Sequence, residues 1–176
     1  MGPSGVGKDT LLDGARLVLA GDPRFAFARR TITRPKDAGG EAHEEATREA
    51  FAAREAAGGF FVTWSAHGLR SGLAASIEAE LAAGRCVIAN VSRTIPAMLA
   101  GRVRAAVVEI TARPDLLAQR LASRGREDDA DIASRLGREG PAYPDSMAVL
   151  PIVNDSTPEI GTQRLVAALR EAAGDA

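Results

Sequence analysis

The hydrophobic positions of this chain fall into short continuous runs and longer stretches with helical spacing. Apolar runs of strand length occupy residues 60–64, 86–91, 105–111 and 149–153. Helical spacing marks residues 11–18, 47–57, 74–83, 114–123, 131–138 and 158–173. Buried strands that alternate with helices predict a mainly parallel sheet with helices on both faces, which is a three-layer α/β fold.

Polar segments separate these elements. Residues 34–45 contain one proline and two glycines and indicate a loop, and residues 66–72 indicate another. Pro96 leaves residues 94–99 weakly helical at best. The chain has no internal repeat and no low-complexity tail.

Length and composition indicate one ordinary globular domain. The 176 residues are 45% hydrophobic and 26% charged, values that exclude disorder and collagen-like repeats. The net charge of −1 argues against a basic surface for nucleic acid. No run approaches a membrane span of about 18 apolar residues, and the single cysteine, Cys86, excludes an internal disulfide. We therefore expect residues 1–176 to form a single cytoplasmic domain without nucleic-acid or membrane partners.

The basic residues are nearly all arginines. Of the 22, only Lys8 and Lys36 are lysines, and alanine is abundant, a combination typical of a GC-rich genome. Most arginines therefore need no functional explanation, whereas the rare Lys8 needs one.

Lys8 completes a phosphate-binding pattern near the start of the chain. The pattern G-x-x-x-x-G-K is formed by Gly2, Pro3, Ser4, Gly5, Val6, Gly7 and Lys8. Glycines let successive backbone N–H groups converge on phosphate oxygens, and the helix predicted next adds its positive N-terminal end. The pattern predicts an ATP-binding loop in which Lys8 reaches the β- and γ-phosphates. The alternative is a glycine turn with a solvated lysine.

The residue after the lysine departs from the usual loop. Asp9 stands where a serine or threonine normally holds Mg²⁺, and Thr10 follows it. We expect Asp9 and Thr10 to form the metal site. The alternative is that Thr10 supplies the hydroxyl and Asp9 only caps the helix.

A second departure is that Met1 adjoins the loop, where a buried central strand normally precedes it. The neighbouring strands would then lose backbone hydrogen-bond partners, at about 1–3 kcal/mol for each buried group. We expect the first strand to be missing here and the natural product to begin several residues earlier with an apolar, β-branched segment. A trimmed version and a degraded, inactive gene product are the alternatives.

Five stretches along the chain carry a family signature. They are G-P-S-G-V-G-K-D-T at 2–10, R-x-I-T-R at 30–34 with Gly40, Glu41 and His43, W-S-A-H-G-L at 64–69, N-V-S-R at 90–93 and L-x-x-R-L-x-x-R-G-R-E at 117–127. The chain thereby resembles the guanylate-kinase-like branch of the P-loop nucleoside monophosphate kinases, and within it the ribose 1,5-bisphosphate phosphokinases of phosphonate catabolism. The resemblance implies a P-loop NTPase fold with an acceptor arm at residues 30–72 and a lid at residues 120–138.

Two positions differ from guanylate kinases. The serine that helps to read guanine is replaced by Arg30, and the tyrosine of the nucleotide-contacting Tyr-Gly-Thr is replaced by Ser71. Loss of polar groups matched to guanine weakens discrimination strongly. Arg30 instead suits an acceptor that carries more phosphate.

The resemblance also implies roles for residues near the nucleotide. Arg124, Arg126 and Arg135 match lid arginines that clamp phosphates and stabilise the transferred charge. Asn154 follows the last predicted strand, where related kinases contact adenine. Solvated arginines and ordinary turn chemistry are the alternatives.

The acceptor-binding region of the family is matched by Arg30, Arg34, Glu41, Ser92 and Arg93. A polar surface loop is the alternative for the first three. Related kinases usually carry an acidic residue where this chain has Asn90. We interpret Asp9 and Asn90 as a linked exchange, in which Asp9 restores the missing carboxylate near the metal.

The resemblance implies an ATP-dependent kinase that converts ribose 1,5-bisphosphate to 5-phospho-ribose 1-diphosphate, with ATP and Mg²⁺ as cofactors. Its acceptor is a phosphate that is already ionised, so no general base is needed. A nucleoside monophosphate kinase, guanylate kinase first, is one alternative. A non-catalytic guanylate-kinase-like interaction module is another, and the presence of Lys8 argues against it.

Overall fold

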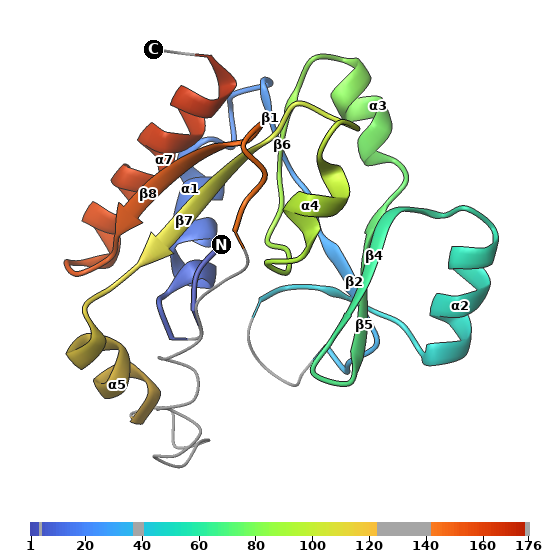
Figure 1. The fold of residues 1–176 in the computed structure, drawn as a ribbon, viewed down its shortest axis with the longest axis horizontal. Coiled ribbons are helices and arrows are strands. Elements are labelled where there is room, and N and C mark those ends of the chain that lie inside the picture. The colour runs from blue at the N-terminus through green and yellow to red at the C-terminus, as the bar shows by residue number, and fades with distance from the viewer. Residues whose placement is uncertain (4, 37–40, 123–141, 175–176) are drawn as a thin grey trace. The chain divides into compact units, whose positions relative to one another are not determined.

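The computed structural model describes residues 1–3, 5–36, 41–122 and 142–174, which fall into two compact units. The first unit combines Met1–Val18 with Arg93–Ala176, and the second unit is Leu19–Ser92. Figure 1 labels most elements of both. Each unit contains one two-stranded parallel sheet among the described residues.

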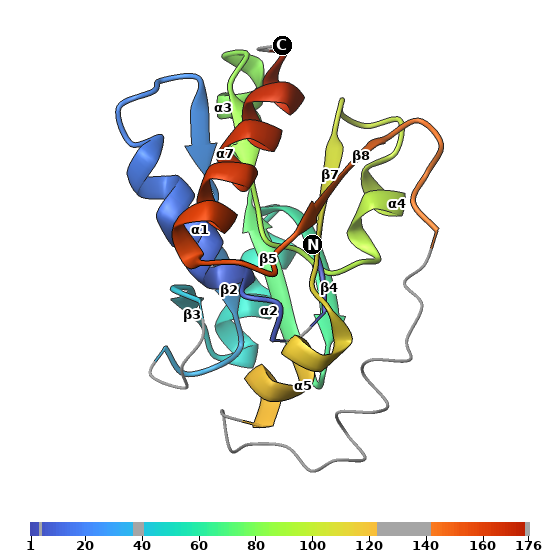
Figure 2. The same ribbon diagram turned by 90° about the vertical axis from the view of Figure 1, so that its left-hand side faces the viewer.

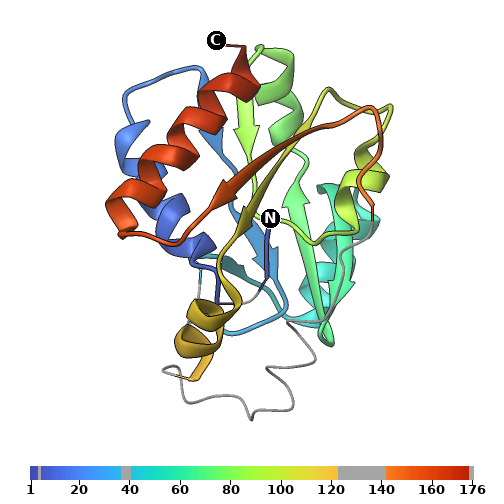
Figure 3. The same ribbon diagram turned by 60° about the vertical axis from the view of Figure 1, so that its left-hand side comes forward.

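The first unit is a two-stranded parallel sheet with two long helices packed together beside it. Its elements are α1 (Lys8–Val18), α4 (Ile95–Leu99), β7 (Ala106–Thr111), α5 (Pro114–Ala122), β8 (Ala148–Val153) and α7 (Pro158–Ala173). α1 and α7 lie side by side, and α7 also contacts β7 and β8 (Figures 2 and 3). Because β7 and β8 run parallel, their carboxyl ends meet at one edge, where α5 and α7 begin.

Two glycines allow α1 and α7 to approach closely. A Cβ atom at Gly14 would lie 2.4 Å from Oγ1 of Thr162, and one at Gly161 would lie 2.7 Å from Cδ2 of Leu11. Leu11 is fully buried in this contact region. Since α7 follows β8 directly, the helix contact brings the beginning of α1 to the carboxyl end of β8.

The start of the phosphate loop is anchored on β7. The amino group of Met1 donates a hydrogen bond to the carbonyl of Val108, and the Ile110 N–H donates to the Met1 carbonyl at 2.7 Å. This is the pattern of a parallel ladder. Gly2 follows with φ of 148°, and a Cβ atom there would lie 2.1 Å from the Ile110 carbonyl oxygen. Only glycine therefore fits at this position.

The second unit combines the other parallel strand pair with a four-stranded mixed sheet. Its elements are β1 (Phe25–Phe27), β2 (Arg30–Ile32), β3 (Glu44–Glu45), α2 (Arg48–Ala56), β4 (Phe60–Ala66), β5 (Leu69–Ala74), α3 (Ile77–Ala82) and β6 (Cys86–Ile88). β1 pairs in parallel with β6. The mixed sheet has the order β3-β2-β5-β4, in which β2 and β3 are parallel while β5 runs antiparallel to both of its neighbours.

α2 packs on the mixed sheet through one aromatic ring and one carboxylate. The fully buried Phe51 stacks on Phe60 of β4 with ring centroids 4.5 Å apart. Glu55 accepts hydrogen bonds from Thr63 at 2.7 Å and from Arg70. The hydrogen bond from Thr63 has the larger effect and that from Arg70 the next, and both lower the pKa of the Glu55 carboxyl. The contacts hold α2 against β4 and β5.

The predicted elements are largely confirmed. α2, β4, β7, α5, β8 and α7 begin and end within a few residues of the predicted limits. Trp64 is buried as a core residue, and burial raises the pKa of the half-buried Cys86 thiol. The helix predicted at residues 131–138 lies outside the described residues. Within the described ranges, no helix has the length and apolar character needed to cross a membrane.

The loop predicted at residues 66–72 is wrong. β4 runs to Ala66 and β5 starts at Leu69, so these residues form a tight hairpin. His67 and Gly68 make its turn with φ of 52° and 73°. Hairpin turns with two left-handed residues usually have the sequence Asn-Gly or Asp-Gly. Here the first residue is histidine, so the sequence did not indicate the turn. Because β5 continues to Ala74, the helix predicted from residue 74 begins only at Ile77.

The two-stranded parallel sheets, β1 with β6 and β7 with β8, lie in different units. In the described part of the chain, the residue that pairs with β7 on the side away from β8 is Met1. One residue satisfies two backbone groups of β7 but does not form a strand. Among the described residues, β7 therefore has β8 as its one neighbouring strand.

We expect Gly72→Ala to destabilise the protein by about 1–3 kcal/mol, the usual cost of overpacking. A Cβ atom at residue 72 would lie 2.7 Å from Cδ1 of Phe60, whose ring is stacked on Phe51. Urea unfolding measures the difference. Gly21→Ala is the matched control, because a Cβ atom there meets nothing within 4 Å. Equal stability of the two variants would contradict the packing described for this sheet.

Candidate functional site

The phosphate loop curls tightly between β7 and α1. Gly5 and Gly7 have φ of 80° and 88°, a left-handed conformation that glycine adopts without strain. Val6 between them is fully buried, which turns the loop backbone around its side chain. α1 begins at Lys8, and the Leu11 N–H donates to the Gly7 carbonyl at 3.1 Å. The predicted loop residue Ser4 lies outside the described residues.

Lys8 folds over this loop. Its Nζ atom donates hydrogen bonds to the carbonyl oxygens of Gly2 at 2.9 Å and Pro3 at 2.8 Å. The ammonium group is therefore held beside the loop, with its four-carbon stem free to carry it to a nearby anion. The role of Lys8 at the β- and γ-phosphates stays a prediction.

Asn154 connects the phosphate loop to the sheet. The residue is 4% exposed, and its Nδ2 donates to the Val6 carbonyl at 2.7 Å. Its backbone N–H donates to the Thr111 carbonyl at 2.7 Å, which continues the β7–β8 ladder by one step. Its own carbonyl accepts from Nη1 of Arg120 on α5 at 3.1 Å. One residue thus joins the loop, the end of β7 and α5.

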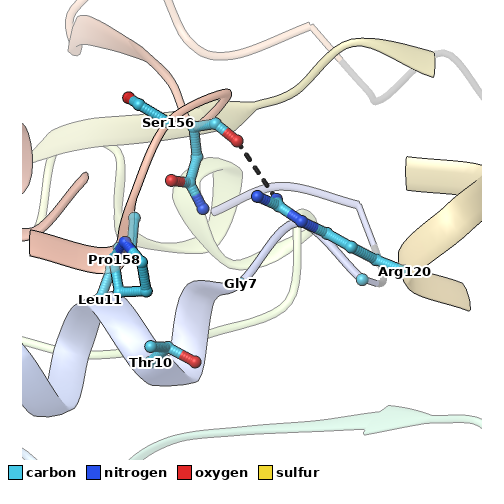
Figure 4. A pocket seen from close by; sticks show the side chains of 8 residues that line it. Gly7, Thr10, Leu11, Arg120, Ser156 and Pro158 are labelled. Carbon is cyan, nitrogen blue, oxygen red and sulfur yellow. Dashed lines mark hydrogen bonds between the residues drawn. The ribbon is translucent and has the colours of Figure 1, made fainter. Parts of the chain in front are cut away.

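A cavity of about 220 Å³ opens beside the loop (Figure 4). It is lined by Gly5, Gly7, Thr10, Leu11, Arg120, Asn154, Ser156 and Pro158. The Arg120 guanidinium reaches over from α5, and Leu11 and Pro158 lie on the opposite side in Figure 4. A cavity at the carboxyl end of parallel strands, next to a helix N-terminus, is the usual place for a phosphate ligand in this class of fold.

Several of these lining residues were not assigned to the site from the sequence. Ser156 lies between β8 and α7, Pro158 is the first residue of α7, and Leu11 reads as an ordinary core position. The sequence contained a partial indication of Ser156 and Pro158. Ligands bind outside the carboxyl ends of parallel strands, and residues 154–158 follow the last predicted strand. The predicted lid arginines Arg124, Arg126 and Arg135 lie outside the described residues.

The two predicted metal ligands have different surroundings. Both lie in the first turn of α1, and Thr10 lines the cavity whereas Asp9 is not among its lining residues. The described residues contain no cluster of three histidine, cysteine, aspartate or glutamate side chains that could hold a metal ion. Magnesium in phosphate-transfer sites is usually held by few protein groups together with water and substrate phosphates. A single hydroxyl at Thr10 fits that donor set.

A second group of predicted site residues lies in the second unit, around the carboxylate of Glu41. Oε1 of Glu41 accepts from Nε of Arg30 at 2.5 Å, and Oε2 accepts from Nδ2 of Asn90 at 2.5 Å. The Arg30 guanidinium also lies 5.9 Å from the centre of the Trp64 ring. The structure therefore brings Arg30, Glu41 and Asn90 together.

His43 fixes the backbone on both sides of this region. It is 2% exposed, with Nδ1 3.0 Å from the Glu41 carbonyl and Nε2 3.0 Å from the Arg34 carbonyl. Arg29 donates to the His43 carbonyl at 3.0 Å. The sequence signature contained His43 without indicating this structural role.

The remaining predicted acceptor residues are Arg34, Ser92 and Arg93. Nε of Arg34 is buried and has no hydrogen-bond partner in the described ranges, while its Nη2 lies 3.3 Å from Nδ1 of His43. Ser92 and Arg93 lie in the segment between β6 and α4, where the second unit ends and the first unit resumes.

The known proteins that this chain resembles in sequence are named as ribose 1,5-bisphosphate kinases, alone or joined to a second enzyme. The chain is 48% identical over 172 residues to ribose 1,5-bisphosphate phosphokinase PhnN of Methylobacterium radiotolerans, covering 97% of this chain and 94% of that protein. It is 54% identical over 170 residues to a bifunctional ribose 1,5-bisphosphokinase-thymidine phosphorylase of Azorhizobium caulinodans, covering 96% of this chain and 24% of that protein. The chain thus spans about a quarter of the length of such bifunctional relatives. No family model matches the chain.

The fold also has solved relatives. A crystal structure of guanylate kinase from Anaplasma phagocytophilum aligns with a TM-score of 0.63 and 16% sequence identity, covering 97% of this chain and 81% of that one. This similarity shows the fold, and the predicted P-loop α/β class is confirmed.

Asn154→Asp should weaken nucleotide binding about tenfold. The new carboxylate would face the Val6 carbonyl, and losing a hydrogen bond to a buried acceptor costs about 1–3 kcal/mol. Isothermal titration of ATP in the presence of Mg²⁺ measures the change. Asp155→Asn is the matched control, because Asp155 is exposed and bonds Arg164 rather than the loop. An unchanged ATP affinity in Asn154→Asp would rule out this anchor.

Proposed function

We propose, because the chain belongs to the ribose 1,5-bisphosphate phosphokinase family, that it transfers the γ-phosphoryl group of ATP to ribose 1,5-bisphosphate. The products are ADP and 5-phospho-ribose 1-diphosphate. The observation that carries the proposal is the anchored phosphate loop, with Lys8 folded over it and a cavity beside it at the carboxyl end of β8.

The donor side of the reaction uses the first unit. Backbone N–H groups of the loop Gly2 to Gly7, except at Pro3, which has none, are proposed to bind the ATP phosphates, and Lys8 to neutralise the β- and γ-phosphates. Arg120 already lines the cavity, and Arg124, Arg126 and Arg135 are proposed to complete the phosphate clamp. Asn154 holds the loop in shape and lines the nucleotide cavity. Thr10, with Asp9 beside it, would hold Mg²⁺, which screens the phosphate charges when bound.

The acceptor side needs cations rather than a base. The 1-phosphate of the acceptor is ionised near neutral pH, so its oxygen attacks the γ-phosphorus directly and the ADP oxygen leaves. Catalysis then depends on positioning and on neutralising several negative charges. Arg30, Arg34 and Arg93 are proposed to bind acceptor phosphates. Glu41 is proposed to accept a hydrogen bond from a ribose hydroxyl, and the Ser92 hydroxyl to donate one to the acceptor.

The second unit also supports this acceptor over a guanine nucleotide. Ser71, which replaces the nucleotide-contacting tyrosine, is 5% exposed and lies opposite Ile32 and Trp64 in the mixed sheet. With so little of its surface exposed, Ser71 is a poor contact for a nucleotide. Arg30 stands where a guanine-reading serine is expected, and its charge suits phosphate rather than a base edge.

The acceptor is tested by offering ATP with either ribose 1,5-bisphosphate or GMP and following ADP release. We expect faster turnover with ribose 1,5-bisphosphate and a new diphosphate signal in the ³¹P spectrum of the product. Faster turnover of GMP would show a nucleoside monophosphate kinase instead. Failure to bind ATP at millimolar concentration would favour a non-catalytic module.

Lys8→Ala should lower kcat by at least about 100-fold, the effect of removing one preorganised charge from a phosphoryl or oxyanion site. The side chain contacts two loop carbonyls and fills no core space, so the melting temperature should change little. Lys36→Ala is the matched control, since it removes the chain's other lysine from an exposed position. A Lys8→Ala enzyme with wild-type kcat would refute the role of the loop lysine.

A further inference from the structure

The side chain of Asn90 makes a contact that its predicted link with Asp9 does not explain. Its amide donates to Oε2 of Glu41 at 2.5 Å, while the other oxygen of the same carboxylate accepts from Arg30. Glu41 and Arg30 are only 15% and 19% exposed at the side chain. The carboxylate is thus held on both sides, by Arg30 of β2 and by Asn90, the second residue after β6.

The partners of Arg30 leave one side of its guanidinium available. Nε is bonded to Glu41, and Trp64 lies 5.9 Å from the guanidinium carbon. In the described part of the chain, the two terminal nitrogens of Arg30 make no hydrogen bond. Two parallel N–H donors at the end of a fixed guanidinium match the oxygens of a phosphate group.

The charge of residue 90 decides whether this arrangement is stable. A neutral amide donates to Glu41 and leaves one negative charge opposite the one positive charge of Arg30. An aspartate of the same shape would place a second carboxylate within hydrogen-bond distance of the first, and two such groups cannot both ionise there at low cost. It would also add a negative charge beside a site meant for an anionic acceptor.

We propose that Asn90 is a positioning and specificity residue for the acceptor, acting through Glu41 to hold the Arg30 guanidinium ready for one of the acceptor's phosphates. This inference rests on the proposed function, because it assumes an acceptor with a phosphate at Arg30. It assigns Asn90 to the acceptor side, and it explains a neutral residue here by the charge of the substrate. The backbone of Glu41 is held separately, by the buried ring of His43.

The test compares three variants of the full chain: Asn90→Asp, Asn90→Ala and the double exchange that carries both Glu41→Gln and Asn90→Asp. Asn90→Asp should raise the KM for ribose 1,5-bisphosphate about 10- to 100-fold, as expected for disrupting a hydrogen bond to a charged group. The KM for ATP should stay within about twofold. Asn90→Ala should raise the acceptor KM less, because it removes the donor without adding a charge.

The double exchange distinguishes positioning from a general loss of structure. With Gln at 41 and Asp at 90, the glutamine amide donates to the aspartate and its carbonyl accepts from Arg30, so the same three groups remain connected. The double variant should recover much of the acceptor affinity that Asn90→Asp loses. Asn154→Asp is the matched control: it makes the same chemical change at the only other asparagine and should raise the KM for ATP rather than for the acceptor.

The outcomes separate this inference from the proposed function. A wild-type enzyme that does not use ribose 1,5-bisphosphate overturns the proposed function. An active wild type whose acceptor KM is unmoved by Asn90→Asp overturns the role of Asn90 alone. So does a double exchange that binds the acceptor no better than Asn90→Asp. If Asn90→Asp does not fold, an acceptor KM that Asn90→Ala leaves unchanged is equally decisive against it.

Discussion

The hydrogen bond from the buried Asn154 amide to the Val6 carbonyl determines the shape of the phosphate loop. A loop that turns its N–H groups toward a ligand must turn some carbonyls inward, and an inward carbonyl without a donor costs about 1–3 kcal/mol. Asn154 supplies that donor at 2.7 Å. It can do so because α7 carries Gly161, where a Cβ atom would lie 2.6 Å from the Asn154 Oδ1. The Asn154 side chain therefore contributes both to the shape of the phosphate loop and to the packing of α7.

The same residue links the donor site to the sheet. Its backbone extends the pairing of β7 and β8, and its carbonyl receives Arg120 from α5. At the other end of the loop, Gly2 lies so close to β7 that no side chain fits. The phosphate loop is thus attached at both ends to the sheet formed by β7 and β8. Such rigidity favours a site whose chemistry is mainly positioning and charge neutralisation.

The arginines of the chain fall into two kinds. Arg24, Arg54 and Arg113 pair with nearby acidic residues at the surface, contacts that contribute little to stability. Arg30 and Arg120 differ, because each is tied to a buried or half-buried group of a candidate site. Composition alone explains the first kind. The second kind is recognised only by what each guanidinium contacts.

Local patterns in the sequence were sufficient to predict the phosphate loop, the major helices and the strands β4, β7 and β8, because backbone geometry and hydrophobic spacing leave a direct trace in neighbouring residues. They also indicated Arg30 and Glu41 as acceptor residues through a family signature. They did not reveal the His67–Gly68 hairpin turn, the anchoring of Val6 by Asn154 or the bond between Asn90 and Glu41. Those contacts join residues 148 and 49 positions apart along the chain in two cases, and only chain folding brings their polar atoms within bonding distance.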